Sequence, residues 1–80
     1  MNKKEMANKL RNKADTMRQL AKKNPDVTIW FKDAGDMEHM AGMVEQGDFW
    51  SALEFAQNRD TEFRESVPND VWNYLVQNNS

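Results

Sequence analysis

The 80-residue chain contains no cysteine, one histidine, one tyrosine, three glycines and two prolines. Without cysteine it has neither disulfide bridges nor a thiolate zinc site, which commonly stabilise small secreted domains. No stretch approaches the roughly 18 consecutive apolar residues that a membrane-spanning helix requires, and no apolar run follows the basic start of the chain. We therefore expect a soluble cytoplasmic protein that makes no membrane contact.

Side chains suited to catalysis are also scarce. Nucleophilic and acid–base enzymes usually combine His, Cys or a shielded carboxylate with an orienting partner, and His39 is the only histidine. The three glycines are too widely spaced for a phosphate-binding loop. Met37, Met40 and Met43 flank His39, but methionine is a common core filler and residues at this spacing spread around a helix. We predict no enzymatic activity, no catalytic residues, no cofactor and no metal site.

The net charge of −2 conceals a strong segregation of charge. Residues 1–23 hold eight basic and two acidic residues, a net +6, whereas residues 24–80 hold three basic and eleven acidic residues, a net −8. Four basic residues share one side of a predicted helix: Lys4, Arg11, Arg18 and Lys22. Such a face can follow a phosphate backbone or an acidic protein. Because the acidic remainder would repel a polyanion, mutual packing of the two segments, within one chain or between copies, is an equal alternative.

Residues 1–23 lack Gly and Pro and are rich in good helix formers, so we predict a long basic helix there. An apolar seam recurs along it at spacings of three and four: Ala7, Leu10, Ala14, Met17 and Ala21. The small alanine side chains of this seam permit close approach of another helix. The seam packs either on the rest of the chain or against a second copy, so self-association is plausible.

Residues 26–31 alternate β-branched and aromatic side chains after the break at Pro25, which predicts a short extended segment. We expect it to be a connector buried through Val27, Ile29 and Phe31, since no partner strand is evident. A helical hairpin is predicted over residues 33–63, with Asp33 as its first cap.

Gly47 is expected to end the first helix of that hairpin and Asp48 to cap the second. Met37, Met40 and Met43, if not all buried, would form part of a partner-binding patch. The last helix is predicted over residues 67–77, after Ser66 and Pro68. Three residues are predicted to be buried in the core: Phe49, Leu53 and Trp72. Trp30 and Trp50 also lie in apolar stretches that predict a core position.

Two short stretches resemble known families. Residues 47–56, GDFWSALEFA, look like the opening of a tetratricopeptide helix, although a single copy makes no repeat array. Residues 67–74, VPNDVWNY, resemble the C-terminal end of the Hha/YmoA family, small helical proteins that bind a bacterial nucleoid protein; residues 56–59, AQNR, depart from that family's Ala-Asp-His-Arg pattern. The second resemblance implies a small bacterial co-regulator.

Taken together, the sequence predicts a single all-α domain over residues 1–80, a bundle of about four helices with one extended segment at 26–31. We expect a non-enzymatic accessory protein of phage or plasmid type, an inhibitor or modulator that binds another protein. Association with nucleic acid through the basic helix is the alternative. The predicted partner-binding residues are Lys4, Arg11, Arg18, Lys22, Trp30, Met40 and Met43.

Overall fold

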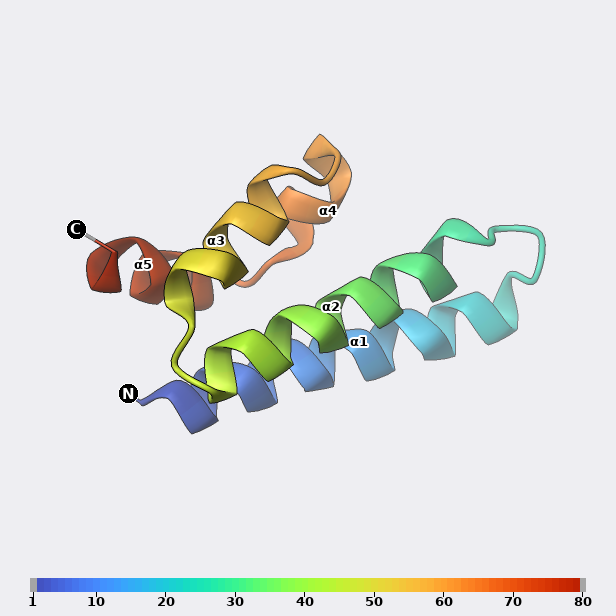
Figure 1. The fold of residues 1–80 in the computed structure, drawn as a ribbon. Helices are drawn as coiled ribbons and strands as arrows, with labels where there is room; N and C mark the ends of the chain where they lie inside the picture. The colour runs from blue at the N-terminus through green and yellow to red at the C-terminus, as the bar shows by residue number, and fades with distance from the viewer. Residues whose placement is uncertain (1, 80) are drawn as a thin grey trace.

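The computed structural model describes residues 2–79, so Met1 and Ser80, the ends of the predicted domain, lie outside the described residues. This part of the chain forms five helices and no strand (Figure 1). The helices are α1 (Lys3–Lys23), α2 (Ile29–Glu45), α3 (Phe49–Gln57), α4 (Thr61–Ser66) and α5 (Asn69–Asn78). The all-α prediction is confirmed, whereas the number of helices exceeds the four expected.

Helix α1 follows the sequence prediction closely. The Asn2 side chain accepts a hydrogen bond from the Glu5 amide at 2.9 Å, which satisfies one of the free N–H groups of the first turn. At the other end, the Asn24 side chain donates to the Leu20 carbonyl at 3.0 Å. Lys22 and Lys23 lie in the last turn, where positive charge favours the helix dipole. Capping at both ends therefore bounds a helix of 21 residues.

Helix α2 corrects two predictions. The segment 26–31 is not an extended connector, because α2 begins at Ile29 and only the turn before it is irregular. Val27 is half-buried, while Ile29 and Phe31 are exposed. Asp33 is not a cap either, since it lies inside the helix and only 7% of its surface is exposed. The alternation of β-branched and aromatic residues did not produce a strand, because no neighbouring strand offers backbone hydrogen bonds.

The turn between α2 and α3 forms as predicted. Gly47 adopts φ +83°, a left-handed conformation that favours glycine after a helix. The next residue, Asp48, accepts a hydrogen bond from the Ser51 amide at 3.2 Å and caps α3. This short connection fixes the point at which the chain leaves the long helices.

The C-terminal third contains a helix that the sequence pattern did not reveal. Asp60 accepts a hydrogen bond from the Phe63 amide at 2.8 Å and begins the six-residue helix α4 inside the predicted hairpin. The last helix, predicted over 67–77, starts instead at Asn69 with Pro68 in the cap position. The predicted hairpin of residues 33–63 is therefore replaced by α2, α3 and α4.

The long antiparallel pair of the fold is α1 with α2, which share the most extensive helix–helix contact (Figure 1). Helices α3, α4 and α5 form a second group that packs over the half of this pair nearest the N-terminus. The other half ends in the turn of residues 24–28 and projects beyond the second group. We call this projecting half the distal end of the α1–α2 hairpin.

The core confirms the apolar seam of α1. Its five predicted residues are all buried, and all of them except Ala21 belong to the core cluster that α1 shares with α2. Self-association stays a prediction, but the seam offers no free surface for it, because all five residues are buried within this chain. Met40 is fully buried as well, so it belongs to the core and is removed from the predicted partner-binding surface. Phe49, Leu53 and Trp72, predicted to be buried, are only partly buried at the edge of the core.

Candidate functional site

The distal end of the α1–α2 hairpin exposes large apolar side chains. Leu20 on α1 is 41% exposed, and Ile29 and Phe31 on α2 are 37% and 49% exposed. Trp30, which the sequence predicted as a partner-binding residue, is half-buried between them. Residues two apart on a helix point to opposite sides, so Ile29 and Phe31 lie on the two flanks of α2. Both flanks of the distal end thus present apolar surface to solvent.

One flank of the distal end contains a cleft of about 210 Å³ between α1, α2 and α4. Its apolar wall is formed by Met17 and by three further residues, which we call the apolar wall residues: Leu20, Ile29 and Trp30. Its polar lining comes from three helices: Lys13, Thr16, Asp33, Glu62 and Ser66. The cleft is smaller than the roughly 300–1,000 Å³ typical of pockets for drug-sized ligands. Its size suits a single inserted side chain.

Asp33 is the most unusual residue of the cleft. It is more than nine-tenths buried, and within residues 2–79 no hydrogen bond or ion pair satisfies its carboxylate. Burial, followed by the negative charges of Asp60 and Asp36, raises the pKa of Asp33 above its ordinary value. Glu62 acts in the same direction, whereas Lys32 opposes it. Partial burial of a carboxylate without a partner is unfavourable. The Asp33 oxygens are not fully buried, since Asp36 Oδ2 is the buried side-chain atom without a hydrogen-bond partner among residues 2–79, so this carboxylate keeps contact with the open cleft.

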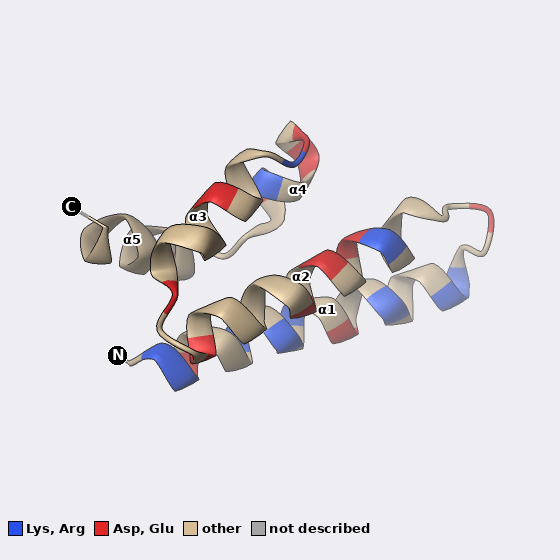
Figure 2. Cartoon of the chain, viewed as in Figure 1, with Lys and Arg blue, Asp and Glu red and all other residues tan. Residues whose placement is uncertain are grey.

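The predicted basic face is largely neutralised inside the molecule. Basic residues run along α1 and acidic residues lie on α2 beside it (Figure 2). The two terminal guanidinium nitrogens of Arg18, Nη1 and Nη2, contact the two carboxylate oxygens of Glu38 at 2.8 and 2.6 Å, and Arg11 contacts Glu45 at 2.6 Å. These hydrogen bonds raise the pKa of both arginines and lower the pKa of both glutamates.

A third ion pair, between Lys9 and Asp70, joins α1 to α5. Lys4 and Lys22 remain exposed, and in the described part of the chain neither of them is ion-paired. Three of the eight basic residues of residues 1–23 thus pair with acidic residues of the later segment, at the surface of the molecule. Arg11 and Arg18, the centre of the predicted partner-binding face, are occupied by these pairs.

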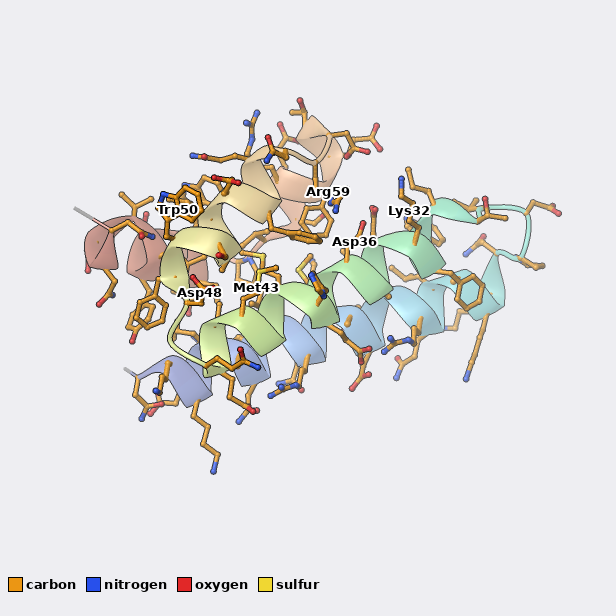
Figure 3. The ribbon with its side chains drawn as sticks, viewed as in Figure 1. Lys32, Asp36, Met43, Asp48, Trp50 and Arg59 are labelled. Atoms are coloured by element: carbon orange, nitrogen blue, oxygen red, sulfur yellow. The ribbon has the colours of Figure 1, made fainter. Side chains whose placement is uncertain are left out.

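A second polar cluster lies between α2 and the end of α3. Asp36 and Arg59 face each other there (Figure 3), with Arg59 Nε 3.8 Å from Asp36 Oδ2. Arg59 also lies over the ring of Phe55, at 4.2 Å from its centroid. Asp36 Oδ2 is buried and makes no hydrogen bond within the described residues. The ion pair and the cation–π contact together hold the end of α3 against α2.

The remaining predicted residues have mixed positions. Met43 is half-buried and lines a shallow pocket between α2 and α3, so it contributes some surface there. His39 is exposed and its ring lies 5.0 Å from that of Phe55, whereas the neighbouring Met37 is fully buried. Trp50, expected in the core, is 64% exposed on the side of α3 away from the α1–α2 hairpin (Figure 3).

Neither a metal site nor a membrane span is found in the described chain. Residues 2–79 contain no group of three or more His, Cys, Asp or Glu side chains placed to hold a metal ion. Within the same residues, no helix has both the length and the apolar character needed to cross a bilayer.

The sequence interpretation missed the apolar wall residues Leu20 and Ile29 and the cleft residues Asp33, Lys13 and Glu62. One signal for the distal end was present. Three consecutive large apolar residues, 29–31, cannot all face the core when they are helical, because each successive residue turns by 100°. A second signal was an acidic residue, Asp33, at a core-facing position of the periodic apolar residues of α2.

Comparisons with known proteins add no relationship for this chain. A scan against models of known families finds no match, and searches of curated proteins and of solved structures find none either. The two short sequence resemblances are therefore not extended by any of these comparisons, and function is argued from the geometry of the distal end.

Proposed function

We propose that this protein is a non-enzymatic accessory protein that binds another protein through the distal end of its α1–α2 hairpin. The observation that carries the proposal is the exposure of the apolar wall residues around a cleft, on the half of the hairpin that projects beyond α3 and α5 and is bordered by α4. Clustered exposed apolar side chains next to a tryptophan are typical of protein interfaces. Isolated apolar residues on a surface need no such explanation.

The charges favour a protein over nucleic acid as the ligand. A nucleic-acid surface needs basic side chains that are free to contact phosphates, and Arg11 and Arg18 are engaged by Glu45 and Glu38. The cleft itself holds two carboxylates, Asp33 and Glu62, which would repel a phosphate backbone. Nucleic-acid binding was the alternative from the sequence. Within the described residues, only Lys4 and Lys22 of the predicted basic face remain free of ion pairs to support it.

The test is affinity capture of tagged protein from cells of its natural host, with and without nuclease. The double variant Leu20→Gln with Ile29→Gln removes two apolar wall residues and keeps good helix formers at exposed positions. Trp50→Gln with Val76→Gln is the matched control, because both residues are exposed and lie outside the distal end.

We expect the wild type and the control variant to recover the same protein, whether or not nuclease is present, and the distal-end variant to lose it. Circular dichroism verifies that all three proteins are equally helical. Recovery that is equal for all three would refute the distal end as the binding surface. Recovery abolished by nuclease would favour the nucleic-acid alternative.

A further inference from the structure

We propose that the distal cleft binds the cationic side chain of a lysine or arginine presented by a partner polypeptide. This inference rests on the proposed function and specifies the chemistry of its partner. Two features of the cleft support it: the carboxylate of Asp33 has no partner among residues 2–79, and the apolar wall residues line the same cleft. The complementary ligand is a positive charge carried on an aliphatic stem.

The carboxylate requires a cation rather than a neutral group. Asp33 as a residue is 7% exposed, and no donor among residues 2–79 hydrogen-bonds to its carboxylate, so the cost of its partial burial is not offset within the chain. Glu62 lines the same cleft, which makes its lining more acidic than basic. A buried ion pair becomes favourable when the opposite charge arrives with good geometry and hydrogen bonds.

The walls fit the stem of a basic side chain. Leu20, Ile29 and Trp30 offer apolar surface along which the methylene groups of Lys or Arg can lie while the charged head reaches the acid. The ring of Trp30 can also attract the cation. Thr16 and Ser66 line the cleft as well and offer hydroxyl oxygens as acceptors for the remaining N–H groups.

Lys13 is the cation that this chain itself could supply. It lines the cleft, yet it forms no ion pair with Asp33 or with Glu62. If Lys13 were the natural partner of Asp33, a ligand cation would have to displace it. Lys13→Met keeps the stem, removes the charge and therefore separates an internal pair from a site for an external cation.

The test is a titration of ¹⁵N-labelled protein, followed by amide chemical shifts, with a set of short capped peptides. Three peptides differ at one central position, which is Lys, Arg or the uncharged norleucine, and free cadaverine is the fourth probe. We expect Lys and Arg peptides to shift the amides of the cleft residues Leu20, Trp30, Asp33 and Ser66, with an affinity about tenfold or more above that of the norleucine peptide.

Substitutions then assign the effect to the carboxylate. Asp33→Asn is expected to abolish the preference for a cationic peptide, whereas Asp26→Asn, in the exposed distal turn, is expected to keep it. Lys13→Met is expected to bind the Lys peptide at least as tightly as the wild type. A weaker affinity in that variant would contradict the site.

Three further outcomes would overturn the inference: equal affinity for the Lys and norleucine peptides, shifts outside the cleft, or an unchanged preference in Asp33→Asn. Tighter binding of cadaverine than of the peptides would assign the site to free amines and refute a polypeptide source. Because the peptides replace the natural partner, their failure leaves the result of affinity capture intact. Conversely, if the distal-end variant captures the same protein as the wild type, the proposed function is refuted even if the peptides bind.

Discussion

Phe63 is the residue whose removal should damage this fold most specifically. Its side chain is only 1% exposed, and its ring meets that of Phe55 edge-to-face with centroids 6.3 Å apart. It is also the one buried residue of α4. A helix of six residues is far below the roughly 12–15 residues at which isolated helices become stable, so packing of Phe63 holds α4 in place.

The expected cost of Phe63→Ala follows from this burial. Replacing a buried phenylalanine by alanine costs about 3–5 kcal/mol, while a domain of this length has a total stability of about 4–12 kcal/mol. In contrast, Leu53 is only half-buried, so Leu53→Ala should cost less than the about 2 kcal/mol that is the lower limit for buried leucines. The two substitutions therefore compare how much side-chain packing in α4 and in α3 contributes to the free energy of unfolding.

Urea denaturation followed by circular dichroism at 222 nm measures both effects. With a slope near 1 kcal/mol per molar urea, which is usual for a small domain, Phe63→Ala should lower the midpoint by about 3 M or more and Leu53→Ala by less than about 2 M. If the alanine variant does not fold at all, Phe63→Leu provides a smaller step in the same direction. A midpoint that falls more for Leu53→Ala than for Phe63→Ala would refute the packing described for α4.

Two further predictions concern charge. Burial and neighbouring carboxylates raise the pKa of Asp33 in the folded state, so its contribution to stability improves as the pH falls from neutral toward the ordinary aspartate value of about 3.9. Glu38 and Glu45, whose pKa values are lowered, act in the opposite direction over this range, so the effect of Asp33 is measured as a difference between two proteins. Asp33→Asn should be more stable than the wild type at neutral pH, and this difference should shrink as the pH falls, which thermal melts of both proteins check. Arg11→Glu with Arg18→Glu should lower the melting temperature by placing like charges opposite α2, and reversing the two glutamates that they contact should restore it; no restoration would show that these pairs do not form in solution.

Helix content and the main seam could be predicted from sequence, because they depend on local patterns. Ala7, Leu10 and Ala14 recur at helical spacing, and Gly47 and Asp48 mark a helix end and a helix start. These signals need no knowledge of distant contacts, and the structure places each of these residues as expected.

The remainder depends on tertiary packing that a linear pattern does not contain. Helix α4 has a single buried residue, so it shows no periodicity to recognise. Helix α2 starts at Ile29 despite the local preference of residues 26–31 for extended structure, because residues 2–79 contain no strand with which an extended segment could pair. The cleft was also not predictable, because Lys13, Asp33 and Glu62 come from three helices whose relative positions only the fold determines.

Site-specific photo-crosslinking in living cells tests most directly whether the distal end contacts a partner protein. A photoreactive phenylalanine analogue is placed at Ile29 in one variant and at Trp50 in another, since both side chains are exposed. We predict adducts at position 29 that protease destroys and nuclease leaves intact, and none at position 50. Adducts at position 50 alone, or nuclease-sensitive adducts at position 29, would contradict binding of a protein at the distal end.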